Sequence, residues 1–122
     1  MACSMRILFL TRDLIFPSQI AGMIRQKAGE LKVVAREEQL LQEASQNSVA
    51  LVILDLSTPG LNPGHLLPAL RKQNSDIGPI VAFGPHVQEG RLTAARQAGC
   101  DEVLSQGEFR HCVGSLLDQH CG

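Results

Sequence analysis

The segment VILDLSTPG, residues 52–60, places one carboxylate at the end of an unbroken apolar run. Its first three residues are apolar without polar alternation, which is typical of a strand that is buried on both faces of a parallel sheet. Asp55 ends the run, and a Thr-Pro-Gly turn follows closely. Because binding sites of open parallel sheets lie at the carboxyl ends of the strands, Asp55 is a candidate functional residue.

The rest of the chain repeats this pattern of short apolar runs rich in Val, Ile and Leu. The five expected strands are ILFL (7–10), LKVVA (31–35), VALVIL (49–54), PIVAF (79–83) and DEVLS (101–105). The segments between them carry apolar residues at helical spacing, which predicts helices. These helices are expected over 17–29, 37–47, 62–73 and 88–98, with a fifth after Ser105.

Several residues predict where the helices begin and end. Gly99 is a natural C-terminal cap for the fourth helix, and Ser105 and Glu108 have the spacing of a capping box for the fifth. The Asn-Pro pair at 62–63 suits the N-cap and first turn of the third helix. Pro68 lies about one turn further on, so this helix either starts late or kinks.

Five strand–helix units in this order predict one α/β domain over residues 1–122. Right-handed crossovers wind such a chain into a three-layer, doubly wound sandwich, with a parallel five-stranded sheet in the flavodoxin-like order 2-1-3-4-5. We expect two helices on one face of this sheet and three on the other. The binding site of this strand order lies where the first and third strands end, and Asp55 ends the third.

Composition excludes several classes of function. The 122 residues carry a net charge of −1, so no positive field attracts nucleic acid or an acidic membrane. The chain has no Trp or Tyr and only four Phe, which leaves little to stack on single-stranded nucleic acid. Its apolar runs are too short to span a bilayer or to form a signal peptide. We therefore expect a cytoplasmic protein with reduced cysteines.

Over nearly its whole length the sequence resembles the receiver domain of bacterial two-component response regulators. LVILDLSTPG is similar to the phospho-acceptor segment of that family, in which an aspartate ends the third strand and a proline follows four residues later, as Asp55 and Pro59 do. AGCDEVLS at 98–105 resembles the Gly-Ala-Asp-Asp segment that leads into the fifth strand. The resemblance implies a CheY-like fold with Asp55 as the candidate phospho-acceptor.

Most of the receiver active-site pattern is missing. Receivers carry two acids after the first strand, which bind magnesium together with the acceptor; here those positions hold Thr11 and Arg12, and Asp13 falls one place late. The Thr or Ser that ends the fourth strand of a receiver is replaced by Gly84, and the lysine after the fifth strand by Gln106. Phosphoryl transfer to a carboxylate depends on cations at the transferring oxygens, so the resemblance is to a pseudo-receiver.

Other residues are predicted to lie around Asp55. Arg12 is the one cation expected nearby, and we predict that it forms a salt bridge with Asp55 at the carboxyl edge of the sheet. Ser57 follows the acceptor closely. Asp13 is either a helix N-cap or a surviving metal ligand. His86, in the loop FGPHV, is either a pH-sensitive partner of Asp55 or an exposed turn residue.

These observations predict a stand-alone pseudo-receiver that acts as a protein-interaction module in bacterial signal transduction, without phosphotransfer or enzyme activity. The resemblance implies that a protein partner or a second copy docks on the face built by the fourth helix, fifth strand and fifth helix. Val103 occupies the place of the aromatic switch residue of receivers. We expect no cofactor, no magnesium at Asp55, and neither nucleic acid nor membrane as a partner.

Two alternatives stay open. One is an atypical receiver that uses Asp55 as a phospho-acceptor in a phosphorelay, and the other is a small-ligand sensor with a pocket around Asp55, Gly84 and His86. Magnesium dependence distinguishes the first, and thermal stabilisation by a ligand distinguishes the second. Flavin binding is disfavoured, because the segment TRDLIF after the first strand has no glycine to cradle a phosphate.

Overall fold

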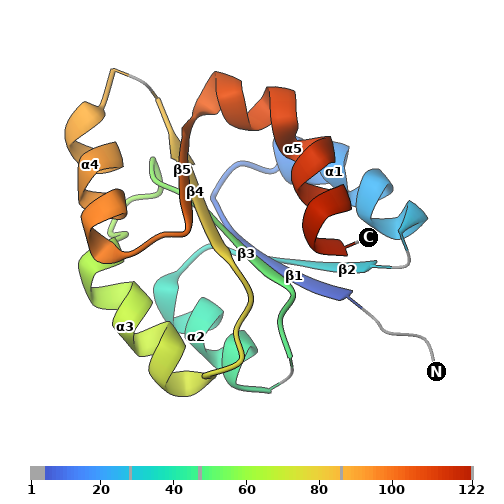
Figure 1. Ribbon diagram of the computed structural model, residues 1–122, viewed down its shortest axis with the longest axis horizontal. Helices are drawn as coiled ribbons and strands as arrows, with labels where there is room; N and C mark the ends of the chain where they lie inside the picture. The colour runs from blue at the N-terminus through green and yellow to red at the C-terminus, as the bar shows by residue number, and fades with distance from the viewer. Residues whose placement is uncertain (1–4, 28, 47, 86, 122) are drawn as a thin grey trace.

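The computed structural model of the protein describes residues 5–27, 29–46, 48–85 and 87–121, in which strands and helices alternate (Figure 1). The strands are β1 (Met5–Leu10), β2 (Gly29–Val34), β3 (Leu51–Asp55), β4 (Ile80–Gly84) and β5 (Glu102–Ser105). The helices are α1 (Ile15–Gln26), α2 (Glu37–Gln46), α3 (Pro63–Gln73), α4 (Glu89–Ala98) and α5 (Gln106–Cys121).

All pairings in the sheet are parallel, and the strand order is β2-β1-β3-β4-β5. This confirms the predicted 2-1-3-4-5 topology. Every residue of β3 and β4 is buried, which is why their sequences are apolar without alternation. In the register, Leu10 of β1 lies between Val34 of β2 and Leu54 of β3. The carboxyl ends of the three strands therefore meet at one edge of the sheet.

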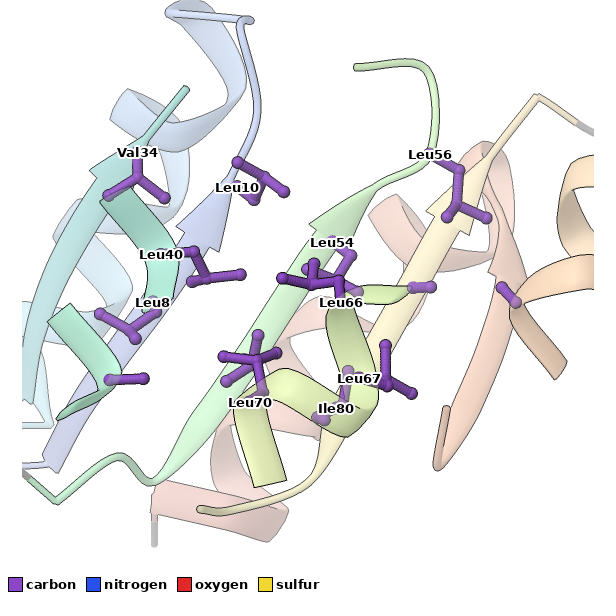
Figure 2. Close-up of a cluster of buried hydrophobic side chains, with 14 of the residues drawn as sticks. Leu8, Leu10, Val34, Leu40, Leu54, Leu56, Leu66, Leu67, Leu70 and Ile80 are labelled. Carbon is purple, nitrogen blue, oxygen red and sulfur yellow. The ribbon is translucent and has the colours of Figure 1, made fainter. Parts of the chain in front are cut away.

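Helices cover both faces of the sheet. Figure 1 shows α1 and α5 together on one face and α2, α3 and α4 on the other, as the sequence predicts. The core on the three-helix face consists mainly of leucines, several of which Figure 2 shows between the sheet and the helices α2 and α3. Burial of each such side chain contributes about 1.5–3 kcal/mol to folding.

The core on the two-helix face contains every aromatic residue of the chain. These are Phe9 of β1, Phe16 of α1, Phe83 of β4 and Phe109 of α5. Phe83 and Phe109 are stacked, with ring centroids 4.4 Å apart, and the other ring pairs meet edge to face. The guanidinium of Arg110 lies 5.0 Å above the Phe16 ring, a cation–π geometry that caps the cluster.

The predicted capping residues of α4 and α5 are confirmed. Gly99 ends α4 in the left-handed region, with φ of 102°, which a residue with a side chain adopts only under strain. The Ser105 amide donates to Glu108 Oε1 at 2.9 Å, and the Glu108 amide donates to Ser105 Oγ at 3.2 Å. Together these two bonds form the capping box of α5.

Both ends of α1 differ from the prediction, whereas the bounds of α3 agree with it. Helix α1 begins at Ile15 and ends at Gln26, so it lies earlier than the expected 17–29; its proline falls in the first turn, where the missing N–H has no helical partner anyway. Helix α3 does not start late, because it begins at Pro63 and continues through Pro68. Asn62 occupies the N-cap position of α3, but its side chain makes no capping hydrogen bond.

The connection from α3 to β4 depends on one close backbone approach. The Gly78 amide donates to the carbonyl of Val49 at 2.9 Å. A Cβ atom added at Gly78 would lie 2.1 Å from the carbonyl oxygen of Ala50, far inside van der Waals contact with backbone. Only glycine fits here without a shift of the chain.

Within the described part of the chain, no helix has both the length and the apolar character needed to cross a membrane.

Candidate functional site

Neutral donors hold both carboxylate oxygens of Asp55. This residue ends β3 and is 8% exposed. Oδ2 accepts a hydrogen bond of 2.7 Å from Thr11 Oγ1. Oδ1 accepts two hydrogen bonds from Ser57, one from the amide at 3.0 Å and one from the hydroxyl at 2.6 Å. The three bonds replace the water that burial removes from the carboxylate.

The sheet register explains why Thr11 is the partner. Leu10 pairs with Leu54, so the next residue of each chain segment, Thr11 and Asp55, continues the same row. The Thr11 amide also donates to the carbonyl of Val34, which extends the pairing with β2 by one residue. Thr11 is buried, and its position is therefore set by the backbone on both sides.

The predicted salt bridge between Arg12 and Asp55 is wrong. Arg12 is exposed and takes part in none of the ion pairs among the described residues. The Thr11 hydroxyl meets Asp55, whereas the chain bends at Arg12, whose side chain lies at the surface. The buried carboxylate is compensated by hydrogen bonds instead of a charge.

Asp13 acts at the start of α1. Its Oδ1 accepts a hydrogen bond of 2.9 Å from the amide of Ile15, and its own amide donates to Thr11 Oγ1 at 3.0 Å. The first contact satisfies one of the N–H groups that a helix leaves free at its start. The N-cap position itself holds Leu14, so Asp13 bonds the helix from one residue before that position.

Leu56 fills the space beside Gly84. A Cβ atom at Gly84 would lie 3.1 Å from the Leu56 Cβ and 3.7 Å from Cδ2 of Leu92, both of which are buried. Figure 2 shows Leu56 in the segment that follows Leu54, beyond the end of that strand. The Leu56 amide donates to the carbonyl of Phe83 at 2.8 Å, which fixes this arrangement. A Thr or Ser at Gly84 would require Leu56 to move.

The structure brings neither Gln106 nor Val103 into hydrogen-bond contact with Asp55. Gln106 begins α5, is exposed, and makes no side-chain hydrogen bond to another described residue. Val103 lies in β5, is partly buried, and packs against the leucine core. His86 lies outside the described residues, so the predictions for it stay untested.

The residues around Asp55 do not fit a resident magnesium ion. Mg²⁺ binds through carboxylates in an octahedral set of oxygen ligands, whereas here Asp13 Oδ1 is bonded to the Ile15 amide and both oxygens of Asp55 accept hydrogen bonds from Thr11 and Ser57. In the described residues, no group of three or more His, Cys, Asp or Glu side chains could hold a metal ion. The donor hydroxyl of Thr11 occupies the place of a second acid.

Sequence reasoning did not single out Arg91 or Thr58. The Nη1 atom of Arg91, on α4, donates to the carbonyl of Leu56 at 2.8 Å and so connects α4 to the loop after Asp55. The Thr58 hydroxyl is buried and has no hydrogen-bond partner among the described residues. Arg91 belongs to no recognisable motif, and Thr58 drew attention only as part of a turn, so the three-dimensional arrangement alone brings the two together.

The fold has close structural relatives. A receiver domain of a sensor histidine kinase from Pseudomonas aeruginosa PAO1, solved with a magnesium ion in its active-site cleft, superposes with a TM-score of 0.78 over 98% of each chain, at 21% identity. An orphan response regulator of H. pylori superposes with a TM-score of 0.77 over 98% of each chain, at 13% identity. The fold is that of a response-regulator receiver domain.

A third receiver-fold relative is the chemotaxis response regulator CheY4 of Vibrio cholerae, with a TM-score of 0.76 and 14% identity over 95% of this chain and 98% of the other. No model of a known protein family and no curated protein sequence matches the chain. Identities this low establish the receiver fold alone. What a receiver fold does in this protein depends on the residues of its own site.

Proposed function

We propose that this protein is a pseudo-receiver, a protein-interaction module of bacterial signal transduction that uses the receiver scaffold without phosphotransfer or enzyme activity. The observation that carries the proposal is the bonding of Asp55. Both carboxylate oxygens accept hydrogen bonds from Thr11 and Ser57, and Asp13 is engaged at the Ile15 amide.

The chemistry of phosphoryl transfer supports this interpretation. An incoming phosphoryl group brings negative charge to a carboxylate, and metal ions or basic side chains must offset that charge. Among the described residues, Asp55 has no ion-pair partner, and the position of the receiver lysine holds the neutral Gln106. The cluster offers hydroxyl groups where the transfer requires cations.

The partner surface in this proposal is the face formed by α4, β5 and α5. A hollow of about 360 Å³ on this face is lined by Leu92 and by five charged and polar side chains. They are Glu89, Thr93, Arg96, Ser105 and Glu108. Charges of both signs suit a complementary protein surface, either of a partner or of a second copy of this chain.

The test of phosphotransfer is exposure of the protein to acetyl phosphate and magnesium, followed by intact-mass measurement. We expect no stable phosphoryl adduct in the wild type, and the same spectrum for Asp55→Asn. A receiver with a complete acid and lysine set, treated in parallel, verifies that the reagent is active. A phosphoryl adduct that disappears in Asp55→Asn would support the alternative, an atypical phospho-acceptor.

The partner surface has its own test, because exposed apolar residues also lie elsewhere. Leu14, at the start of α1, is 79% exposed. We expect Arg96→Glu to abolish self-association in sedimentation velocity, or binding of an identified partner, while Leu14→Ser leaves either unchanged. Loss of association in Leu14→Ser but not in Arg96→Glu would show that the interaction surface lies at the start of α1.

A further inference from the structure

A pocket of about 400 Å³ lies between the loop after β3 and the helices α3 and α4. Its lining consists of Leu56, Thr58, Gly60, Leu61, Asn62, Pro63, Arg91 and Ala94. Asp55 is not part of this lining, so the pocket is distinct from the acceptor position. Its volume falls in the range of small-molecule sites, roughly 300–1,000 Å³.

The first polar group of the pocket is the Thr58 hydroxyl. Thr58 is 5% exposed, and its Oγ1 is the one buried side-chain oxygen or nitrogen without a hydrogen-bond partner among the described residues. Folding removes this hydroxyl from water without replacing the lost hydrogen bond, which is unfavourable. An unsatisfied group in the wall of a pocket indicates a missing partner.

The second polar group is the guanidinium of Arg91. Its Nη1 atom is fixed by the carbonyl of Leu56 at 2.8 Å. Arg91 takes part in none of the ion pairs between residues that the structure describes. A guanidinium carries five N–H groups in a planar fork, and one anchored nitrogen leaves the others to bind an anion.

The third contribution comes from the start of α3. Asn62 and Pro63 line the pocket, and the Asn62 side chain makes no capping bond to the helix. The partial positive charge at the start of this helix is partly offset, because the Asn62 amide already donates to Glu37 Oε2 at 2.7 Å. The remaining walls are apolar side chains, namely Leu56, Leu61 and Ala94.

We infer that this pocket binds a small organic carboxylate. The carboxylate pairs with Arg91 and supplies the hydrogen-bond partner that Thr58 lacks, and the apolar body of the ligand lies against Leu56, Leu61 and Ala94. Arginine binds both carboxylates and phosphates in a planar, two-bonded geometry, so it is the apolar lining that favours an organic carboxylate over a simple inorganic anion. The inference goes beyond the proposed function, because it uses neither Asp55 nor the partner surface.

The test is an NMR titration of the full chain with benzoate, with benzyl alcohol as the uncharged analogue and inorganic phosphate as the anion without an apolar body. We expect saturable shifts from benzoate in the amides of Thr58, Leu61 and Asn62, and in the side-chain Nε–H of Arg91. Benzyl alcohol and phosphate should bind at least roughly tenfold more weakly, the loss expected when a charge-assisted pair or the apolar contact is missing.

Variants assign the contacts. We expect Arg91→Gln to weaken benzoate binding by roughly tenfold or more, whereas Arg96→Gln, the matched substitution on the same helix, leaves it unchanged. Thr58→Val should weaken binding without lowering the melting temperature, because its hydroxyl has no partner in the free protein to lose.

The inference is overturned if benzoate gives no saturable shifts at millimolar concentration, if phosphate binds as well as benzoate, or if Arg91→Gln and Arg96→Gln behave alike. Asp55→Asn should bind benzoate as the wild type does. The Asp55→Asn variant separates the two proposals. Phosphorylation of Asp55 would refute the pseudo-receiver without changing the binding of benzoate in the pocket.

Discussion

The Thr11 hydroxyl donates a 2.7 Å hydrogen bond to Oδ2 of Asp55, across the boundary between β1 and β3. Both residues are buried, and the pairing of Leu10 with Leu54 brings them together. A hydrogen bond to a buried charge contributes about 1.5–3 kcal/mol to stability. The resemblance to receivers implies that a complete site would carry an acid at position 11. An acid there would repel the Asp55 carboxylate, whereas the Thr11 hydroxyl donates a hydrogen bond to it.

Thr11→Asp should convert this contact into a metal-dependent one. Two neighbouring buried carboxylates repel each other, so we expect the variant to lose about 1–3 kcal/mol of stability without metal. Millimolar magnesium should restore much of the loss, because a divalent cation binds best between two acids. Thermal denaturation with and without magnesium measures both effects.

The matched control for this experiment is Thr11→Asn, because asparagine has the shape of aspartate without its charge. Magnesium should not change the melting temperature of this variant. The wild type should not respond either. A rise in the wild-type melting temperature with magnesium that Asp55→Asn removes would show that the natural site binds the ion after all.

Beryllofluoride, a phosphoryl mimic, should leave the α4–β5–α5 face unchanged. Gly84 has no side chain to follow a phosphoryl oxygen, and Val103 packs in the leucine core without the two rotamers of an aromatic switch. A ligand shifts an equilibrium only when it binds one of two states better. The measurement is an NMR titration of the amides of residues 84–117 with beryllofluoride and magnesium.

Saturable shifts that spread from Gly84 to α5 in this titration would contradict the prediction. The Asp55→Asn variant, titrated in the same way, distinguishes binding of beryllofluoride at Asp55 from weak binding elsewhere.

Gly78→Ala should destabilise the protein. The added Cβ would lie 2.1 Å from the carbonyl oxygen of Ala50, so the backbone at the start of β4 must shift. Overpacking of this kind costs about 1–3 kcal/mol. Urea denaturation measures the loss. The control is Gly114→Ala in α5, where nothing lies within 4 Å of the new Cβ and helix propensity favours alanine by up to about 1 kcal/mol. Equal stability of the two variants would refute the close approach at Gly78.

The capping box of α5 should make stability depend on pH. The hydrogen bond from the Ser105 amide, and then that from its hydroxyl, lower the pKa of the Glu108 carboxyl below its ordinary value. A group with a lowered pKa in the folded state stabilises the fold above the unfolded-state pKa, and this contribution is lost as pH falls through the folded-state pKa. A Glu108→Gln variant should therefore lose less stability than the wild type on acidification. A Glu108 pKa at its ordinary value, measured by NMR, would contradict the prediction.

The strand order was predictable because burial determines composition. The central strands β3 and β4 are covered on both faces, and every residue in them is buried, so no polar residue interrupts either run. Two helix ends were predictable from local residues, because Gly99 adopts the left-handed backbone that ends α4 and the Ser105–Glu108 pair forms the bonds that cap α5. The start of α1 has such a residue in Asp13, which bonds the Ile15 amide, but the expected helix began at residue 17 and was therefore placed two residues late.

The partner of Asp55 was predicted wrongly because Arg12 was chosen for its opposite charge, without regard to where its side chain points. Arg12 and Thr11 both follow β1, but the bond from the Thr11 amide to Val34 keeps Thr11 in the row of Asp55, whereas the chain bends at Arg12. The register would have selected Thr11. The pocket beside Arg91 was beyond prediction, because it depends on contacts between a loop and two helices that have no shared sequence motif.

The gathering of all four phenylalanines on one face of the sheet has a practical consequence for spectroscopy. With no Trp or Tyr, the chain has no intrinsic indole or phenol fluorescence, so any such signal in a mixture comes entirely from an added partner. The near-ultraviolet circular dichroism of the protein reports only on the packing of α1 and α5 against β1 and β4. Far-ultraviolet signals report on all five helices. Unfolding curves from the two regions that fail to coincide would reveal that the two faces of the sheet come apart separately.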